Sequence, residues 1–144
     1  MPSLERAIAI AAEAHAGQKD KADQPYVLHA LRVMLRLDGE HERIAGVLHD
    51  VVEDTPVTLD DLTAEGFARP VIDAVEALTE RPGETRMDAV RRAAADPTAC
   101  AVKLADNAEN RDLSRLPAPT ERDFARLREY EAVRELLLSA RSAS

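Results

Sequence analysis

The sequence predicts an all-α fold, a compact helical bundle, and three observations support that prediction. Apolar residues recur at helical spacing in one segment after another along the chain. N-capping residues, glycines and prolines bound these segments, as they do at the ends of helices. No stretch shows the period-two alternation of a strand, and no repeat of 20 to 50 residues is present. We expect seven or eight helices in a single domain spanning residues 1–144.

Three helices are expected in the first part of the chain. Ser3 is suited to cap the first, which ends near Gly17. A polar loop over 17–25 follows, and Pro25 is expected at the first position of the second helix. The third helix continues until Pro56 stops it. The residues expected to face inward are Leu4, Ala7, Ile8, Ala11 and Ala14 in the first helix, Val27, Leu28, Leu31 and 33–35 in the second, and Ile44, Val47, Leu48, Val51 and Val52 in the third.

The middle of the chain predicts three further helices. Thr58 and Asp61 have the spacing of a capping box, ahead of a short helix over 59–65. A helix over 69–79 follows, with Val71, Ala74, Val75 and Leu78 on one stripe. After a loop, 87–95 is expected to form a modest helix.

Two helices are expected in the last part. Asp96 and Pro97 are typical of the N-cap and first residue of a helix. That helix is apolar on nearly every side over 99–105, so we expect it at the centre of the bundle. A closing helix over about 120–139 begins with a cap from Thr120 and Asp123. Its expected inward residues are Phe124, Leu127, Val133, Leu136 and Leu137.

Composition excludes several classes of protein. Hydrophobic residues make up 45% and charged residues 32%, as in a soluble globular protein, and the apolar runs are too short to span a bilayer. The net charge of −8 argues against binding to nucleic acid or an anionic membrane. The single Cys100 excludes an internal disulfide and is expected to be a small buried hydrophobe. We expect a cytoplasmic protein and leave open whether copies associate.

The stretch "VLHDVVEDT", residues 47–55, places polar groups in an apolar helix. His49 and Glu53 are four residues apart, and so are Asp50 and Asp54, so all four are expected to face one cavity. Burying so many acids without compensation would be very costly, and a bound cation would remove that cost. Ion pairs with Lys or Arg at a solvated helix end are the alternative.

Two more polar residues occupy apolar helices. His29 lies among leucines in "PYVLHALRV", and Asp106 lies within the expected central helix. Each has an ordinary interpretation, as a core histidine or as an acid with a local partner. One divalent metal held by His29, His49, Asp50 and Asp106 would explain both together. Two imidazoles and two carboxylates suit Mn, Fe or Zn better than Ca, and open coordination positions would make the site catalytic.

These residues carry a resemblance to a known family. His29, the pair His49–Asp50 and Asp106 resemble the motif of the HD-domain superfamily of metal-dependent phosphohydrolases. Over about 3–115, "HAGQKDKADQPYVLHALRV", "AGVLHDVVEDT" and "VKLADNAEN" are similar to the hydrolase domain of Rel/Spo proteins and their small stand-alone relatives. The resemblance implies an all-helical bundle of the HD-domain type with a metal site in its core. It also implies Mn-dependent removal of the 3′-pyrophosphate from guanosine tetra- and pentaphosphate alarmones such as ppGpp.

The resemblance also implies roles for individual residues. His29, His49, Asp50 and Asp106 would hold the Mn, and Glu53 and Asp54 would position and activate the attacking water. Asn110, Lys21 and Tyr26 match residues near the nucleotide. Lys103, which neighbours Asp106 on a mostly apolar helix, is our own candidate for a phosphate contact.

The chain departs from the family pattern at Asp20, where Rel/Spo hydrolases usually carry an Arg that lies against the guanine base. An acid offers no guanidinium plane for stacking. Asp20 therefore favours a second hypothesis, an HD-domain phosphohydrolase for another nucleotide or phosphoester. A third hypothesis is a non-catalytic module that binds a metal-nucleotide. The Glu53–Asp54 pair argues against it, since such a module does not need residues that activate water.

Overall fold

The computed structural model describes residues 2–114 and 116–143, and their regular elements are helices apart from one isolated β-bridge between Lys19 and Pro25. The predicted all-α class is confirmed. None of these helices is both long and apolar enough to cross a membrane. The helices are α1 (Leu4–Ala14), α2 (Val27–Leu35), α3 (Glu40–Leu48), α4 (Val51–Asp54), α5 (Leu59–Glu65), α6 (Arg69–Leu78), α7 (Arg86–Ala94), α8 (Pro97–Arg111) and α9 (Glu121–Ala143).

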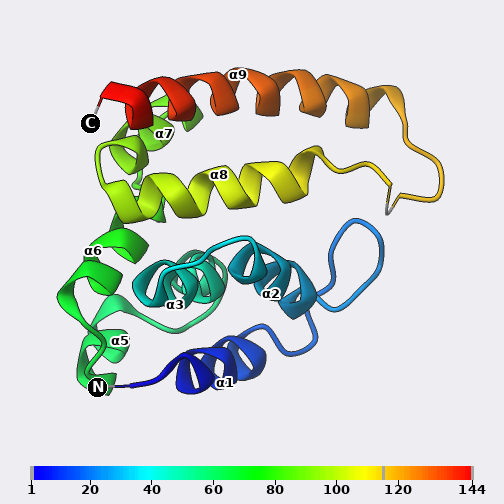
Figure 1. The fold of residues 1–144 in the computed structure, drawn as a ribbon. Coiled ribbons are helices and arrows are strands. Elements are labelled where there is room, and N and C mark those ends of the chain that lie inside the picture. The colour runs from blue at the N-terminus through cyan, green and yellow to red at the C-terminus, as the bar shows by residue number, and fades with distance from the viewer. Residues whose placement is uncertain (1, 115, 144) are drawn as a thin grey trace.

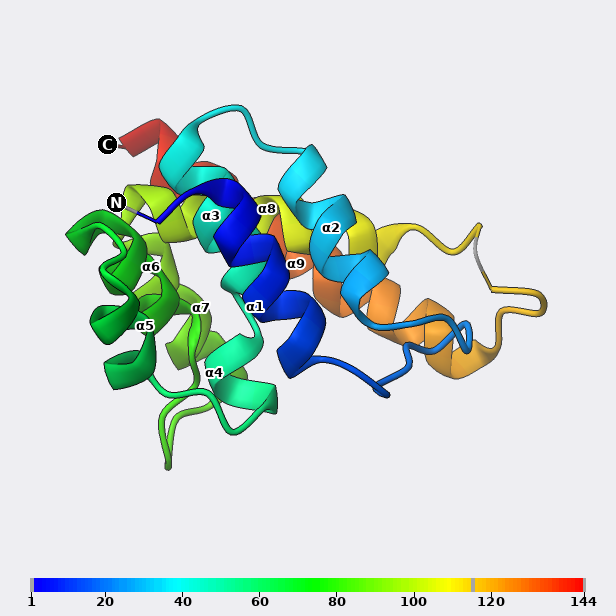
Figure 2. The ribbon, with the colours of Figure 1, turned by 90° about the horizontal axis from the view of Figure 1, so that it is seen from below.

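The helices stack in layers around α3 and α8. Figure 1 shows α9 over α8, α8 over the α2–α3 pair, and α1 on the far side of that pair. Helices α5, α6 and α7 close one end of this stack (Figure 2). At the opposite end, the loop between α1 and α2 lies beside the segment that joins α8 to α9 in both views. The predicted central position of α8 is confirmed, because it packs against α2, α3, α6, α7 and α9.

Most predicted helix starts are confirmed by their caps. Ser3 accepts a hydrogen bond from the Arg6 N–H, and Thr58 and Asp61 form a reciprocal capping box. Asp96 is the N-cap of α8, as predicted: its side chain accepts a hydrogen bond from the Ala99 N–H, and Pro97 is the first residue of the helix. The expectation for Pro25 is wrong: α2 begins at Val27, because Pro25 is held in the bridge to Lys19 that closes the preceding loop.

The predicted third helix is interrupted at His49 and Asp50, so it forms two helices, α3 and α4. The imidazole of His49 is the cause. Its Nδ1 lies 2.6 Å from the carbonyl oxygen of Gly46, the group that would accept the Asp50 N–H in a continuous helix. The chain therefore turns at this point, and α4 restarts with the Asp54 N–H donating to the Asp50 carbonyl at 2.9 Å.

The buried hydrophobic residues form three clusters that together extend from α1 to α9, and one of them includes Cys100, as predicted. Three expected inward residues are exposed instead: Leu28, Leu35 and Phe124, with 37%, 70% and 47% of their surface accessible. Helix α2 is apolar on several sides, so periodicity did not identify the buried face, which carries His29. Phe124 lies in the first turn of α9, which extends past the end of α8 (Figure 1).

Candidate functional site

The four predicted metal ligands meet at the centre of the bundle, although they come from separate elements. His29 projects from α2, His49 and Asp50 from the break between α3 and α4, and Asp106 from α8. His29 Nε2 lies 2.9 Å from Asp106 Oδ1, and His49 Nε2 lies 3.0 Å from Asp50 Oδ2 and 3.6 Å from Asp106 Oδ1. His29, His49 and Asp106 are buried, and only 18% of the Asp50 side chain is accessible.

The chemistry of this cluster fits a divalent cation. Because the carbonyl of Gly46 only accepts, His49 Nδ1 carries a proton, and Nε2 is the ring nitrogen that faces Asp50 and Asp106. That Nε2 is buried and makes no well-aligned hydrogen bond to a described residue, although the carboxylates of Asp50 and Asp106 lie 3.0 and 3.6 Å away. Although burial opposes protonation, Asp50 and Asp106 raise the pKa of His49 well above its ordinary value, which shows how strongly this point attracts positive charge. Neutral imidazoles and ionised carboxylates are the forms that ligate metals.

Glu53 and Asp54 lie beside the cluster on its exposed side. One carboxylate oxygen each from Asp50, Glu53 and Asp54 fall within 4.8 Å of one another. Burial raises the pKa of both Glu53 and Asp54, and nearby carboxylates add to the effect. Glu53 Oε1 accepts a hydrogen bond from the Glu80 N–H at 2.9 Å, which orients it. The predicted stacking of His49 over Glu53 along one continuous helix is wrong because the helix breaks, yet the turn still places both acids next to Asp50.

Tyr26 and Lys21, predicted near the nucleotide, both line a cavity in front of the cluster. The Tyr26 hydroxyl donates to Asp50 Oδ2, and its ring packs between the imidazoles of His15 and His29. Lys21 Nζ lies 3.5 Å from the Tyr130 hydroxyl. Tyr26 is therefore a direct support for one of the proposed ligands.

Lys103 and Asn110 both hydrogen-bond to Asp106. Lys103 Nζ lies 3.5 Å from Asp106 Oδ2, and Asn110 Nδ2 donates to Asp106 Oδ1 at 3.2 Å. Although burial favours the neutral amine, Asp106 and Asp50 raise the pKa of Lys103, so it stays charged. Lys103 is thus a cation next to the proposed metal ligands.

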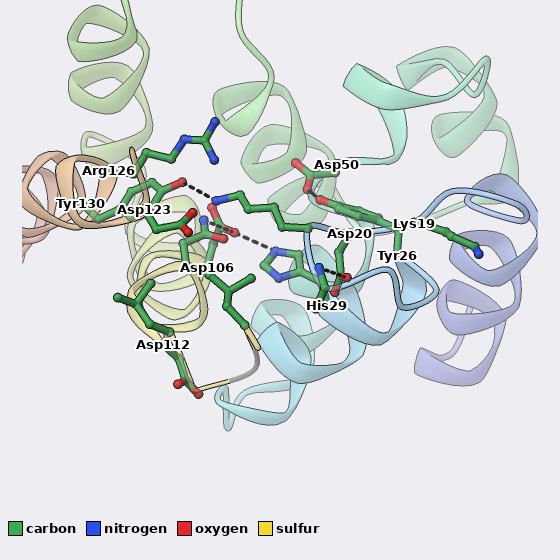
Figure 3. Close-up of a pocket in the computed structure, with 15 residues that line it drawn as sticks. Lys19, Asp20, Tyr26, His29, Asp50, Asp106, Asp112, Asp123, Arg126 and Tyr130 are labelled. Atoms are coloured by element: carbon green, nitrogen blue, oxygen red, sulfur yellow. Dashed lines mark hydrogen bonds and ion pairs between the residues drawn. The ribbon is translucent and has the colours of Figure 1, made fainter. Parts of the chain in front are cut away.

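Two cavities open on either side of this cluster. The first, of about 340 Å³, is lined by Tyr26, His29 and residues of the 17–25 loop and of α9 (Figure 3). The second, of about 180 Å³, is lined by His49, Glu53 and Lys103. Asp50, Asp106, Asn110 and Tyr130 line both, so the cluster can be reached from either side.

Asp20 is used to build the loop. Its Oδ1 accepts the N–H groups of Ala22 and Gln24, at 2.9 and 3.0 Å, and its Oδ2 lies 3.6 Å from an Arg32 nitrogen. Arg32 in turn pairs with the buried Glu109 of α8 at 2.9 Å. The carboxylate thus shapes the loop at the edge of the first cavity.

Several residues of the site were not identified from the sequence. His15, at the end of α1, is 2% accessible, because it packs under Tyr26 and its Nδ1 lies 2.8 Å from Gln18 Oε1. Arg126 and Tyr130, which lie on the predicted closing helix, line the first cavity. Spacing along the sequence gave no signal for them, since their position depends on how α9 packs on α7 and α8.

Comparisons with known proteins agree with this arrangement. Residues 7–130 match the family described as HD domain. A guanosine-3′,5′-bis(diphosphate) 3′-pyrophosphohydrolase from Aquifex aeolicus is 34% identical over 119 residues, which are 74% of this chain and 17% of the relative. The bifunctional (p)ppGpp synthase/hydrolase SpoT of Escherichia coli is 31% identical over 140 residues, 85% of this chain and 20% of the relative. This chain therefore spans about a fifth or less of each of these curated relatives.

One solved structure has a similar fold along nearly the whole chain. It is described as a metazoan ortholog of SpoT that hydrolyses ppGpp and plays a role in starvation responses. It superposes with a TM-score of 0.74 at 26% sequence identity, and the match covers 97% of this chain and 86% of that one.

Proposed function

Because this chain belongs to the HD-domain family, we propose that it is a metal-dependent phosphohydrolase that removes the 3′-pyrophosphate from guanosine tetra- or pentaphosphate. The observation that carries the proposal is the meeting of two imidazoles and two aspartates from three parts of the fold, with a further carboxylate pair beside them. A structural metal site needs no such second pair. The names of the similar proteins supply the substrate class.

His29, His49, Asp50 and Asp106 are the proposed ligands, and Mn is the proposed metal. This mixed nitrogen and oxygen set suits Mn, with Fe and Zn as the other candidates. A divalent cation held here supplies charge stabilisation for phosphoryl oxygens and lowers the pKa of a coordinated water. All four ligands come from one chain, so the proposed reaction requires no second copy.

Glu53 and Asp54 are the proposed water-activating pair. In the proposed reaction a water oxygen bonds to the phosphorus attached to the ribose 3′ oxygen, and the bond from that phosphorus to the 3′ oxygen breaks. A carboxylate of this pair takes the water proton, and the 3′ oxygen takes a proton from solvent. The products from ppGpp are GDP and pyrophosphate. The raised pKa of Glu53 supports its role, because a more basic carboxylate accepts a proton more readily.

The remaining predicted residues are proposed substrate contacts. Lys103, charged and close to Asp106, is placed to stabilise charge on the transferred phosphoryl group. Asn110, Lys21 and Tyr26 line the first cavity, where the nucleotide is proposed to lie. We assign α9 to the same domain because its residues complete that cavity. We propose that the protein is located in the cytoplasm, where nucleotides occur.

A second candidate is hydrolysis of another nucleotide or phosphoester by the same site. Asp20 favours it, because its carboxylate occupies the position where Rel/Spo hydrolases usually carry an arginine against the guanine base. That carboxylate accepts two loop N–H groups and lies close to Arg32. A guanine-specific enzyme would need a different base contact in this cavity.

One experiment separates these candidates and the non-catalytic alternative. Purified protein is incubated with Mn and a panel of nucleotides that includes ppGpp and its adenine counterpart, and the products are identified. GDP and pyrophosphate support the first proposal, and turnover of other phosphoesters alone supports the second. The Glu53→Gln variant should lose turnover, whereas Asp60→Asn, which removes an exposed carboxylate of α5, should not. Binding without turnover, unchanged in Glu53→Gln, would contradict both.

A further inference from the structure

The first cavity has a buried end and an exposed rim, and different groups of residues line the two. At the buried end lie His29, Asp50 and Asp106, the proposed metal ligands. The rim is formed by the 17–25 loop, the segment after α8 and the start of α9. In Figure 3 the side chains of α9 stand on one side of the cavity, opposite Tyr26 and Asp50.

The acidic residues of the rim are engaged in shaping the backbone. Asp20 accepts two loop N–H groups, and Asp112 accepts the N–H of Ser114 at 2.9 Å. Asp123 accepts the N–H and the hydroxyl of Thr120 in the cap of α9, at 2.8 and 3.1 Å. These carboxylates fold the chain around the cavity, and their hydrogen bonds restrict how they can point into it.

The cations of the rim are held more loosely. Among the described residues, Lys21 Nζ makes a 3.5 Å contact to the Tyr130 hydroxyl and lies 5.6 Å from the centroid of that ring. Arg126 is half-buried in the cavity wall and makes no hydrogen bond or ion pair with any residue that the structure describes. Both lie near Asp123. Hydrogen bonds from Thr120 are the main cause of the lowered pKa of the Asp123 carboxyl, and the charges of Lys21 and Arg126 lower it further. A guanidinium without a partner in a cavity wall is available to bind an anion.

We infer that Arg126, together with Lys21, forms a binding site for the 5′-phosphate groups of the nucleotide. The inference rests on the proposed function and deepens it. A 3′-pyrophosphate must reach the buried end of the cavity to meet the proposed metal ligands. The 5′ carbon is attached to C4′, next to C3′, and it leaves the ribose ring on the face opposite to the 3′ oxygen. With the 3′ group at the buried end, the 5′-phosphates can therefore extend toward the rim. Among the described residues of the rim, Arg126 and Lys21 are cations that make no hydrogen bond or ion pair with a carboxylate.

The test compares substrates with and without 5′-phosphates. Mn-loaded protein is assayed with guanosine 3′,5′-bis(diphosphate) and with guanosine 3′-diphosphate, and GDP binding is measured by titration calorimetry. Arg126→Ala should raise the KM for the bis(diphosphate) at least about tenfold more than the KM for the 3′-diphosphate. It should weaken GDP binding by a similar factor, and Arg126→Lys should restore part of both. The matched control is Arg128→Ala, an exposed arginine of α9 outside the cavity, which should change neither.

The outcomes separate this inference from the proposed function. If Arg126→Ala raises the KM for both substrates by the same factor, or behaves like Arg128→Ala, the 5′-phosphate site is overturned. The proposed hydrolase activity is unaffected by that result. GDP binding that depends on Arg126, without hydrolysis of either substrate, would overturn the proposed activity and leave the site standing. Absence of both GDP binding and hydrolysis in the native protein would overturn both.

Discussion

Replacing Tyr26 by phenylalanine tests whether Asp50 belongs to a metal site. The hydroxyl of Tyr26 donates to Asp50 Oδ2, while its ring packs against His15 and His29. Phenylalanine keeps the ring and removes the hydroxyl alone. Asp50 then loses the hydrogen bond that orients its carboxylate toward His49, and the proposed ligand set becomes less ordered.

The size of the effect follows from the burial of that carboxylate. Only 18% of the Asp50 side chain is accessible, so water replaces the lost hydrogen bond poorly. A hydrogen bond to a charged group contributes about 1.5–3 kcal/mol, and we take about 2 kcal/mol here. At about 1.4 kcal/mol per factor of ten, Mn affinity should fall about 30-fold, within the range typical for loss of a residue that orients a ligand.

Competition titration of Mn against a chelator measures this affinity directly. Tyr130→Phe is the matched control, because it removes another hydroxyl of the same cavity, one that contacts Lys21 and no proposed ligand. Native Mn affinity in Tyr26→Phe, or an equal loss in Tyr130→Phe, would refute the reasoning that Tyr26 orients Asp50 as a ligand.

Three further predictions concern the metal, the water-activating pair and the ion pair between Arg92 and Glu84. Mn at 100 times its dissociation constant should stabilise the fold by about 2.7 kcal/mol and raise the melting temperature seen by calorimetry, and a chelator should reverse the rise; an unchanged transition would contradict a metal site. Glu53→Gln should lower kcat by about 10²–10⁴-fold while Mn affinity stays native, as steady-state kinetics and chelator competition would show; a parallel loss of both would make Glu53 a ligand instead. Hydrogen bonds from Arg92 lower the pKa of Glu84 from 4.5 to about 2, so the stability contributed by this pair is complete above pH 4.5 and lost as the pH falls toward 2. The difference in melting temperature between the native protein and Glu84→Gln should therefore shrink over that range, and a constant difference would assign the effect to packing.

Much of the fold could be predicted because its signals are local. Ser3, Thr58 and Asp96 each cap a helix within three residues of themselves, so their effect depends on short stretches of chain. The break at His49 was missed although it is also local. The His49 side chain bonds the Gly46 carbonyl that would accept the Asp50 N–H in a continuous helix. The periodic pattern of apolar residues gives no sign of this competition.

The proposed ligands could be identified because polar residues in apolar helices are costly without a partner, and one shared divalent metal would account for them together. The resemblance then implied the same set of ligands. His15 has the same character but lies at the end of α1, where exposure was the simpler interpretation. Its burial depends on Tyr26, which approaches from beyond the loop. Arg126 was not identified because its neighbours in sequence are charged, as on a solvated helix face, whereas its position in the cavity depends on how α9 packs on α8.

The sequence by itself determined the helices, their caps and which polar residues are out of place in a core, because these depend on spacing along one chain segment. Only the tertiary structure decided that His29, His49, Asp50 and Asp106 converge, that Tyr26 supports Asp50, and that α9 places Arg126 beside the cavity. The physical reason is that helix formation depends on neighbours a turn apart, whereas a site depends on the angles and distances at which separate helices pack.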